Sequence, residues 1–181
     1  MPTYVYTAGN LSLEPWSGLV PLGFFVLFIV NLYMSFSVGH ARRKYGIPYP
    51  TLYAVPGTPR DYAPPKEGST TSATPLTEGK TATITPEEAF YFNCVQRGHQ
   101  NSLENMPVVS VLALVSWSFP IPAGFALLSY ALGRIFYMRG YSVHPEKRNN
   151  VVAAALTYPA LLALWGLSLA TAIQLFRGQP P

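Results

Sequence analysis

Four polar side chains recur along one stretch of the sequence at spacings of four, four and three residues: Asn93, Arg97, Asn101 and Glu104. At 100° per residue they fall within about 80° of one another on a helix. An arginine can bind a carboxylate through two parallel hydrogen bonds, and a glutamate can hold an ammonium group. The stripe therefore predicts a site for a small zwitterionic or anionic ligand. The alternative is an ion pair between Arg97 and Glu104 that only sets the register of a membrane helix.

A second stripe of polar and aromatic residues follows at spacings of four, three and four: Tyr130, Arg134, Tyr137 and Tyr141. Arg148 comes shortly afterwards. If a helix begins at Pro145, Arg148 lies in its first turn, where unpaired N–H groups also favour an anion. Tyrosines in such a stripe are more often interface packing than ligand contacts. We expect both stripes to converge at one membrane boundary.

The position of His99 does not fit a single subunit easily. It points nearly opposite the stripe that contains Arg97. We interpret this as a sign that a neighbouring subunit packs against that face.

Composition indicates that these stripes belong to membrane helices. The chain has 181 residues, of which 49% are hydrophobic and only 11% are charged, roughly half the charged fraction of a soluble domain. One cysteine, Cys94, excludes an intrachain disulfide, and three histidines are too few for a structural zinc site. No phosphate-binding loop, Ser-His-Asp order or metal-binding pair is present, so we expect no metal and no nucleic acid.

The apolar segments predict an all-α integral membrane protein built as a four-helix transmembrane bundle. The expected spans are residues 18–38, 86–119, 123–141 and 145–176, each long enough for a hydrocarbon core of about 30 Å. Residues 1–17 are expected to form an exposed arm, 18–176 the membrane domain and 177–181 a tail. The segment 50–86 is rich in Pro, Ser, Thr and Gly, which predicts a long loop with little regular structure. Thr85 as an N-cap candidate, Pro86 at the first helical position and the acidic residues Glu87 and Glu88 in the first turn predict the start of the second helix.

Positive charge predicts the orientation. Basic residues gather after the first span and around the third connection, whereas the other side has only Arg177. Cytoplasmic loops carry the excess of Lys and Arg, so both termini are expected on the opposite side.

The segment from Phe92 to Glu104, FNCVQRGHQNSLE, resembles the signature of MAPEG proteins, most closely the type 3 microsomal glutathione S-transferase branch. Further similarities are Ala41 to Tyr45 followed by Tyr49-Pro50, then Gly133 to Tyr137 with Gly140-Tyr141, and finally Lys147-Arg148. The resemblance covers most of the four-helix body. Two departures are Asn105, where the leukotriene-synthase branch has a tyrosine, and a first loop about 25 to 30 residues longer than in the family.

The resemblance implies a homotrimer that binds glutathione between subunits near the cytosolic face. It implies glutathione contacts from one subunit at these positions: Arg97, Asn101, Glu104, Tyr137, Tyr141 and Arg148. Arg42 and His99 would come from the neighbouring subunit. Arg148 is expected to stabilise the glutathione thiolate, and Arg43 to act on the second substrate. Cys94 is expected to be packing.

The expected activity is conjugation of glutathione to lipid electrophiles or reduction of lipid hydroperoxides, in the endoplasmic reticulum or a mitochondrial membrane. Two alternatives stay open. One is a non-catalytic lipid-presenting protein of the same fold. The other is an accessory or structural subunit of a larger membrane complex, which the arm and the long loop would join to its partners.

Overall fold

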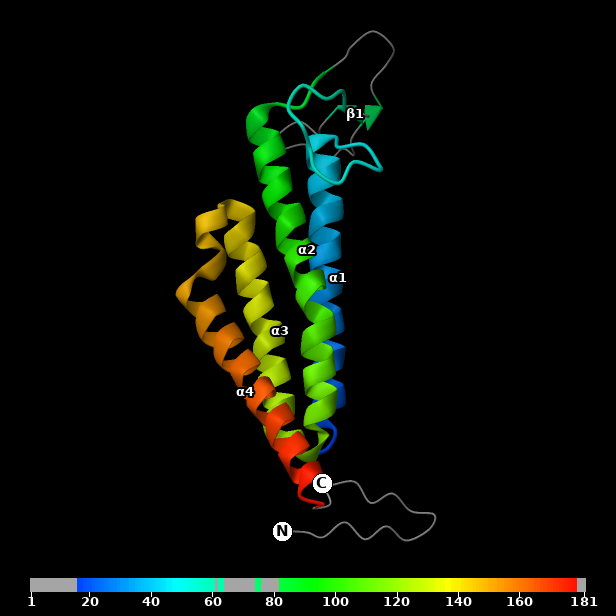
Figure 1. Cartoon of the computed structure of the whole chain (residues 1–181). Coiled ribbons are helices and arrows are strands. Elements are labelled where there is room, and N and C mark those ends of the chain that lie inside the picture. The colour runs from blue at the N-terminus through cyan, green and yellow to red at the C-terminus, as the bar shows by residue number, and fades with distance from the viewer. Residues whose placement is uncertain (1–15, 61, 64–73, 76–81, 179–181) are drawn as a thin grey trace.

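Four long helices form the body of the protein in the computed structural model, which describes residues 16–60, 62–63, 74–75 and 82–178. They are α1 (Leu19–Tyr45), α2 (Pro86–Val115), α3 (Pro120–Val143) and α4 (Val151–Phe176). Successive helices run in opposite directions (Figure 1). The start of α1 and the end of α4 therefore lie at one end of the bundle, and the long first connection lies at the other.

Local sequence accounts for most helix ends. Gly46 ends α1 in the left-handed conformation at φ 65°, where its N–H binds the carbonyl of Arg42. As predicted, Thr85 is the N-cap of α2 and Pro86 lies in its first turn; Thr85 and Glu88 also form a reciprocal capping box there. Between α2 and α3 there is only the short 3₁₀ helix η1 (Ser116–Ser118), so α3 begins directly at Pro120.

The predicted start of the fourth helix at Pro145 is wrong. Residues Pro145–Asn149 form a separate 3₁₀ helix, η2, and α4 begins at Val151. The N-cap of α4 is Asn150, whose side-chain oxygen accepts a hydrogen bond from the N–H of Ala153 at 2.9 Å. An asparagine at this position competes strongly for the role of N-cap, which explains why the α-helix begins there and not at the proline.

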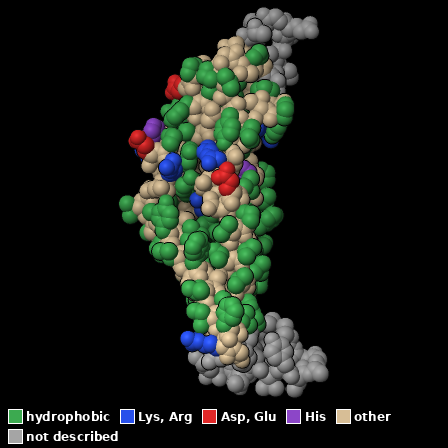
Figure 2. All heavy atoms as spheres, viewed as in Figure 1, with side chains coloured by type: hydrophobic (Ala, Val, Ile, Leu, Met, Phe, Trp, Pro, Cys, Tyr) green, Lys and Arg blue, Asp and Glu red, His purple; other side chains and the backbone are tan. Residues whose placement is uncertain are grey.

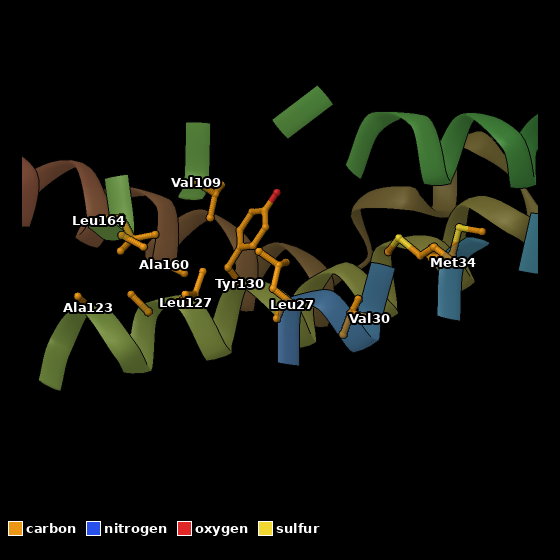
Figure 3. Packing of buried hydrophobic residues seen from close by; sticks show 13 residues of the cluster. Leu27, Val30, Met34, Val109, Ala123, Leu127, Tyr130, Ala160 and Leu164 are labelled. Carbon is orange, nitrogen blue, oxygen red and sulfur yellow. The ribbon is translucent and has the colours of Figure 1, made fainter. Parts of the chain in front are cut away.

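The core that holds the bundle together includes buried residues from all four helices. Figure 3 shows Leu27 and Val30 of α1, Val109 of α2, Leu127 of α3 and Leu164 of α4 converging in it. The ring of Tyr130 stands among them and is only 2% exposed. This residue therefore belongs to the core as well as to the polar stripe on α3.

The described ends of the first connection pack against the bundle. Ile47, Ala54 and Ile84 are buried in a second, smaller cluster with Ala89 and Phe92 of α2 and Ala41 of α1. Beyond them, the two-residue strands β1 (Tyr62–Ala63) and β2 (Thr74–Pro75) pair antiparallel, with Tyr62 opposite Pro75. Pro59 and Thr83 form an isolated bridge. The rest of the predicted loop, and most of the predicted arm and tail, lie outside the described residues.

Among the described residues, three helices are long and apolar enough to cross a membrane: α1, α3 and α4. The second helix has 30 residues and runs alongside α1 and α3 (Figure 1), but its first half is too polar to be recognised by hydropathy alone. Figure 2 shows charged side chains gathered in a band below the loop, and beneath that band many hydrophobic side chains with no charged one until the lower end of the bundle. The described part of the chain is thus an all-helical membrane protein apart from its one short strand pair.

Candidate functional site

A pocket of about 430 Å³ opens between α2, α3, η2 and α4. It lies toward the end of the bundle that carries the long loop. Five of the residues predicted for the site line this pocket: Arg97, Asn101, Tyr137, Tyr141 and Arg148. Three separate parts of the sequence thus meet there, two of them the helical stripes and the third η2. Pockets of this size commonly bind small ligands.

Arg134 forms the floor of the pocket, although it was not among the residues predicted to contact the ligand. Its side chain is buried, and Nε and Nη2 donate to the hydroxyl oxygen of Ser102 at 2.9 and 2.6 Å. Nη2 also donates to Oδ1 of Asn101 at 2.9 Å. The guanidinium lies 3.9 Å from the centre of the Tyr137 ring, a distance at which a cation and an aromatic ring attract. Arg134 therefore joins the two stripes.

Arg97 and Glu104 lie on the outer side of the pocket and pair with each other. Nη1 of Arg97 and Oε1 of Glu104 are 2.9 Å apart, and both side chains are close to half exposed. Glu104 is not one of the pocket-lining residues, so it meets the site through this pair. The Arg97–Glu104 pair can set the register of the helix in the free protein and still bind a ligand. A zwitterionic ligand offers a negative charge to Arg97 and a positive charge to Glu104.

Arg148 reaches the pocket from η2, and the position of η2 depends on Gly140 of α3. A Cβ atom at Gly140 would lie 2.0 Å from the carbonyl oxygen of Lys147, the residue before Arg148. Only a glycine allows the backbone of η2 to approach α3 this closely. The side chain of Asn150 adds a hydrogen bond of 3.1 Å to the carbonyl of Phe136. The side chain of Arg148 is exposed, but the backbone that carries it is held against α3 by these two contacts.

Three predicted residues lie away from this pocket within the subunit. His99 faces α1, where Nε2 is 3.2 Å from the hydroxyl oxygen of Ser35; packing against α1 thus accounts for its direction within one chain. Arg42 is buried, and its guanidinium donates to the carbonyl oxygens of Pro48 at 3.2 Å and Thr51 at 2.6 Å. Arg43 is exposed at the end of α1. That Arg42 and His99 contact a ligand bound by a neighbouring subunit stays a prediction.

Asn93, the first residue of the predicted stripe, holds the loop and does not line the pocket. Its Oδ1 accepts from the N–H of Ala54 at 2.8 Å, and its Nδ2 donates to the carbonyl of the same residue at 3.0 Å. The periodicity placed Asn93 on the correct face of α2. Near the N-terminal end of α2, however, the first connection covers that face, because Ala54 packs on Asn93.

Several residues line the pocket that the sequence did not indicate as ligand contacts: Asn105, Tyr130, Asn149, Ala153, Thr157, Tyr158 and Leu161. Tyr130 belongs to the recognised stripe, and Asn105 stood out only as a departure from the family. The sequence gives no indication that the residues on α4 line a pocket, because Thr157, Tyr158 and Leu161 look like ordinary residues of an apolar span. In the part of the chain that the structure describes, no group of three His, Cys, Asp or Glu side chains is placed to hold a metal.

Comparison with protein families supports the resemblance on which these positions were assigned. The chain matches the MAPEG family over residues 20–170. This range covers most of the sequence and includes all four helices up to the last turns of α4. The protein therefore belongs to the MAPEG family, whose members are membrane-bound and include glutathione transferases and related enzymes.

Proposed function

We propose that this protein is a membrane glutathione transferase or glutathione peroxidase that acts on lipid electrophiles or lipid hydroperoxides. The observation that carries the proposal is the meeting of Arg97, Asn101, Tyr137, Tyr141 and Arg148 around one pocket. These residues come from segments as far apart as 97 and 148 in the sequence, and they are the positions that the family resemblance assigns to glutathione. The proposed substrate class also suits a pocket at the boundary of an apolar bundle.

Glutathione has two carboxylates and one ammonium group, and the paired charges of Arg97 and Glu104 suit such a zwitterion. In the proposed complex a carboxylate of glutathione takes the place of Glu104 on the Arg97 guanidinium. Glu104, released from that pair, accepts hydrogen bonds from the ammonium group. The exchange replaces one ion pair with two, so binding leaves neither Arg97 nor Glu104 without an opposite charge at the edge of the membrane.

Arg148 is the residue we propose to stabilise the glutathione thiolate. A thiol is a poor nucleophile near neutral pH, and its thiolate form is the reactive one. Lowering the thiol pKa by one to two units requires about 1.4 to 2.7 kcal/mol. A guanidinium held just before the N-terminus of α4 can supply this, because the positive charge and the unpaired N–H groups of the first helical turn act on the same anion.

The chemistry needs no further cofactor. In conjugation, the sulfur of the thiolate forms a bond to the electrophilic carbon, and the bond from that carbon to its oxygen or leaving group breaks with the electron pair. In peroxide reduction, the thiolate attacks the outer oxygen and the O–O bond breaks, giving the lipid alcohol after protonation. A second glutathione then reduces the oxidised sulfur, so the products are glutathione disulfide and water. Arg43 stays the proposed contact for the second substrate, and a homotrimer the proposed assembly.

The direct test is binding of glutathione to the purified full-length protein in detergent, followed by measurement of thiolate absorbance. Saturable binding with a thiolate signal near neutral pH is the expected result. Binding without thiolate would contradict the proposed chemistry while keeping the ligand. Absence of binding at millimolar glutathione would remove the proposal altogether.

An accessory role in a larger membrane complex is the second candidate, and one observation favours it. Tyr49, Leu52 and Val55 in the first connection are 78%, 52% and 61% exposed. Apolar side chains exposed together mark a surface that another protein can cover. If this candidate is correct, a protein that fails to bind glutathione should migrate in mild detergent as part of a complex with other chains.

A further inference from the structure

The loop segment next to the site is held in place by side chains of two helices. The guanidinium of Arg42 on α1 binds the carbonyl oxygens of Pro48 and Thr51 and lies 4.4 Å from the centre of the Tyr49 ring. Asn93 on α2 binds both the N–H and the carbonyl of Ala54. The few residues between these two clamps are therefore fixed against the bundle.

Tyr53 lies between the two clamps, and its hydroxyl reaches α2. The hydroxyl donates a hydrogen bond to Oε1 of Gln100 and also interacts with the guanidinium of Arg97. The tyrosine hydroxyl has one proton to donate and lone pairs to accept with. It can therefore give its proton to Gln100 and accept one from Arg97 at the same time.

The arrangement around α2 places Tyr53 and the pocket on opposite flanks of Arg97. Asn101, which lines the pocket, is about 40° further around the helix in one direction, and Gln100 is about 60° away in the other. Glu104, the ion-pair partner of Arg97, lies between them at about 20° from Arg97 on the Gln100 side. The Tyr53 oxygen therefore meets Arg97 on the flank of α2 that lies away from Asn101 and the pocket.

We propose that Tyr53 is a positioning residue of the glutathione site: its hydroxyl, fixed by Gln100, orients the Arg97 guanidinium toward the pocket, so that the first loop is a working part of the site. This inference rests on the proposed function. The proposed role belongs to the base of the loop, where Tyr53 lies, and does not depend on the inserted residues that make the loop long. A long and mobile arginine side chain loses rotamer freedom when it binds a ligand, and a neighbour that fixes it beforehand lowers that cost.

The test compares Tyr53→Phe with Tyr49→Phe in the full-length protein. Both changes remove one loop hydroxyl and keep the ring; Tyr49→Phe leaves intact the ring that stacks on Arg42. Calorimetric titration with glutathione should show binding weakened by about 3- to 10-fold in Tyr53→Phe, as expected for loss of one hydrogen bond of ordinary strength. Tyr49→Phe should bind as the wild type does. Limited proteolysis should give the same loop cleavage rate in both, because the Asn93 and Arg42 clamps remain.

A second pair of variants separates positioning from simple anchoring of the loop. In an Arg97→Lys background, Tyr53→Phe should change glutathione affinity by less than twofold, because a lysine offers a point charge that has no plane to orient. An equal effect in both backgrounds would show that Tyr53 acts independently of Arg97 and would overturn the inference. Equal binding by Tyr53→Phe and Tyr49→Phe would overturn it as well. If the wild type itself does not bind glutathione, the proposed function fails first and the inference with it.

Discussion

The guanidinium of Arg134 and the hydroxyl of Ser102 form the buried polar link between α3 and α2. Two nitrogens of the arginine share one serine oxygen, at 2.9 and 2.6 Å, and the arginine is 4% exposed. A buried charge is tolerated only when its donors are satisfied. One of the residues that line the pocket is thus a buried arginine of α3 whose charge is satisfied by hydrogen bonds to α2.

Removal of the serine hydroxyl should destabilise the bundle and weaken the site together. Ser102→Ala leaves two donors of a buried guanidinium without their acceptor, which costs about 1 to 3 kcal/mol. Thermal unfolding in detergent should show a lower midpoint for Ser102→Ala. The control Ser142→Ala, which removes a hydroxyl bonded only to the carbonyl of Met138 in its own helix, should have a much smaller effect. Equal losses in the two variants would contradict the proposed importance of the Arg134 link.

Arg148→Ala should abolish most thiolate formation and leave the fold intact, because the residue is exposed on η2. Arg148→Lys should recover part of the thiolate signal, since it restores the charge without the planar fork. The measurement is thiolate absorbance as a function of pH in the presence of saturating glutathione. An unchanged apparent pKa of the bound thiol in both variants would exclude Arg148 from the mechanism.

Gly140→Ala should affect the site through the backbone alone. The new methyl group would meet the carbonyl oxygen of Lys147 at 2.0 Å, so η2 must move away and carry Arg148 with it. We expect turnover to fall by about tenfold or more, because small misplacements of a catalytic group are costly. Gly166→Ala on α4, where a Cβ meets no atom within 4 Å, is the matched control. Full activity in Gly140→Ala would show that the position of η2 is unimportant.

The base of the long loop should open at acid pH. Glu88 lies in the first turn of α2, on the loop side of the apolar segment, and pairs with Arg60. Burial raises the pKa of the Glu88 carboxyl, but hydrogen bonds from Arg60 and from Thr85 outweigh this effect and hold the pKa below its ordinary value of 4.5. A lowered folded-state pKa means that the pair stabilises the loop base above pH 4.5 and that this contribution is lost as pH falls through the lower folded value.

Proteolysis rates of the loop between pH 6 and pH 3, with an acid-active protease, should therefore rise more steeply in the wild type than in Glu88→Gln, which cannot titrate. Glu87→Gln, a neighbouring exposed carboxyl, should behave as the wild type does. If Glu88→Gln and the wild type show the same pH dependence, the Arg60 pair does not control the loop base.

The inserted part of the loop should be dispensable for the ligand. Arg60 and Ala82 already face each other, because the N–H of Arg60 binds the carbonyl of Ala82 at 3.1 Å. Deletion of residues 61–81, with Arg60 joined to Ala82 through an Asn-Gly turn, keeps the Arg60–Glu88 pair and the Tyr53 segment. Glutathione binding should stay within about tenfold, or 1.4 kcal/mol. Loss of binding in a folded protein would place the deleted segment in the site, and loss of a larger assembly would favour the accessory role.

The sequence alone predicted the features that depend on neighbouring residues. The four helices, the N-cap at Thr85 and the two polar stripes follow from local hydrogen bonding and from the helical repeat, which act within about four residues. The family signature added which of these positions are expected to bind glutathione, and the match over residues 20–170 supports that family. Of the residues that line the pocket from α2 and α3, Arg97, Asn101, Tyr137 and Tyr141 were recognised in this way.

Only the tertiary structure decided which partner each polar residue meets. Arg42 binds the loop and His99 faces Ser35, while Arg134 links α3 to α2 and Tyr53 reaches Gln100. These contacts join residues that are 9 to 64 positions apart, and their geometry depends on how helices pack and where a loop returns. The start of α4 was missed for a related reason, since Asn150 and the close approach of η2 to Gly140 prevailed over the helix-start signal of Pro145. A helical repeat fixes the face on which a residue lies, but the packing of the chain fixes what lies against that face.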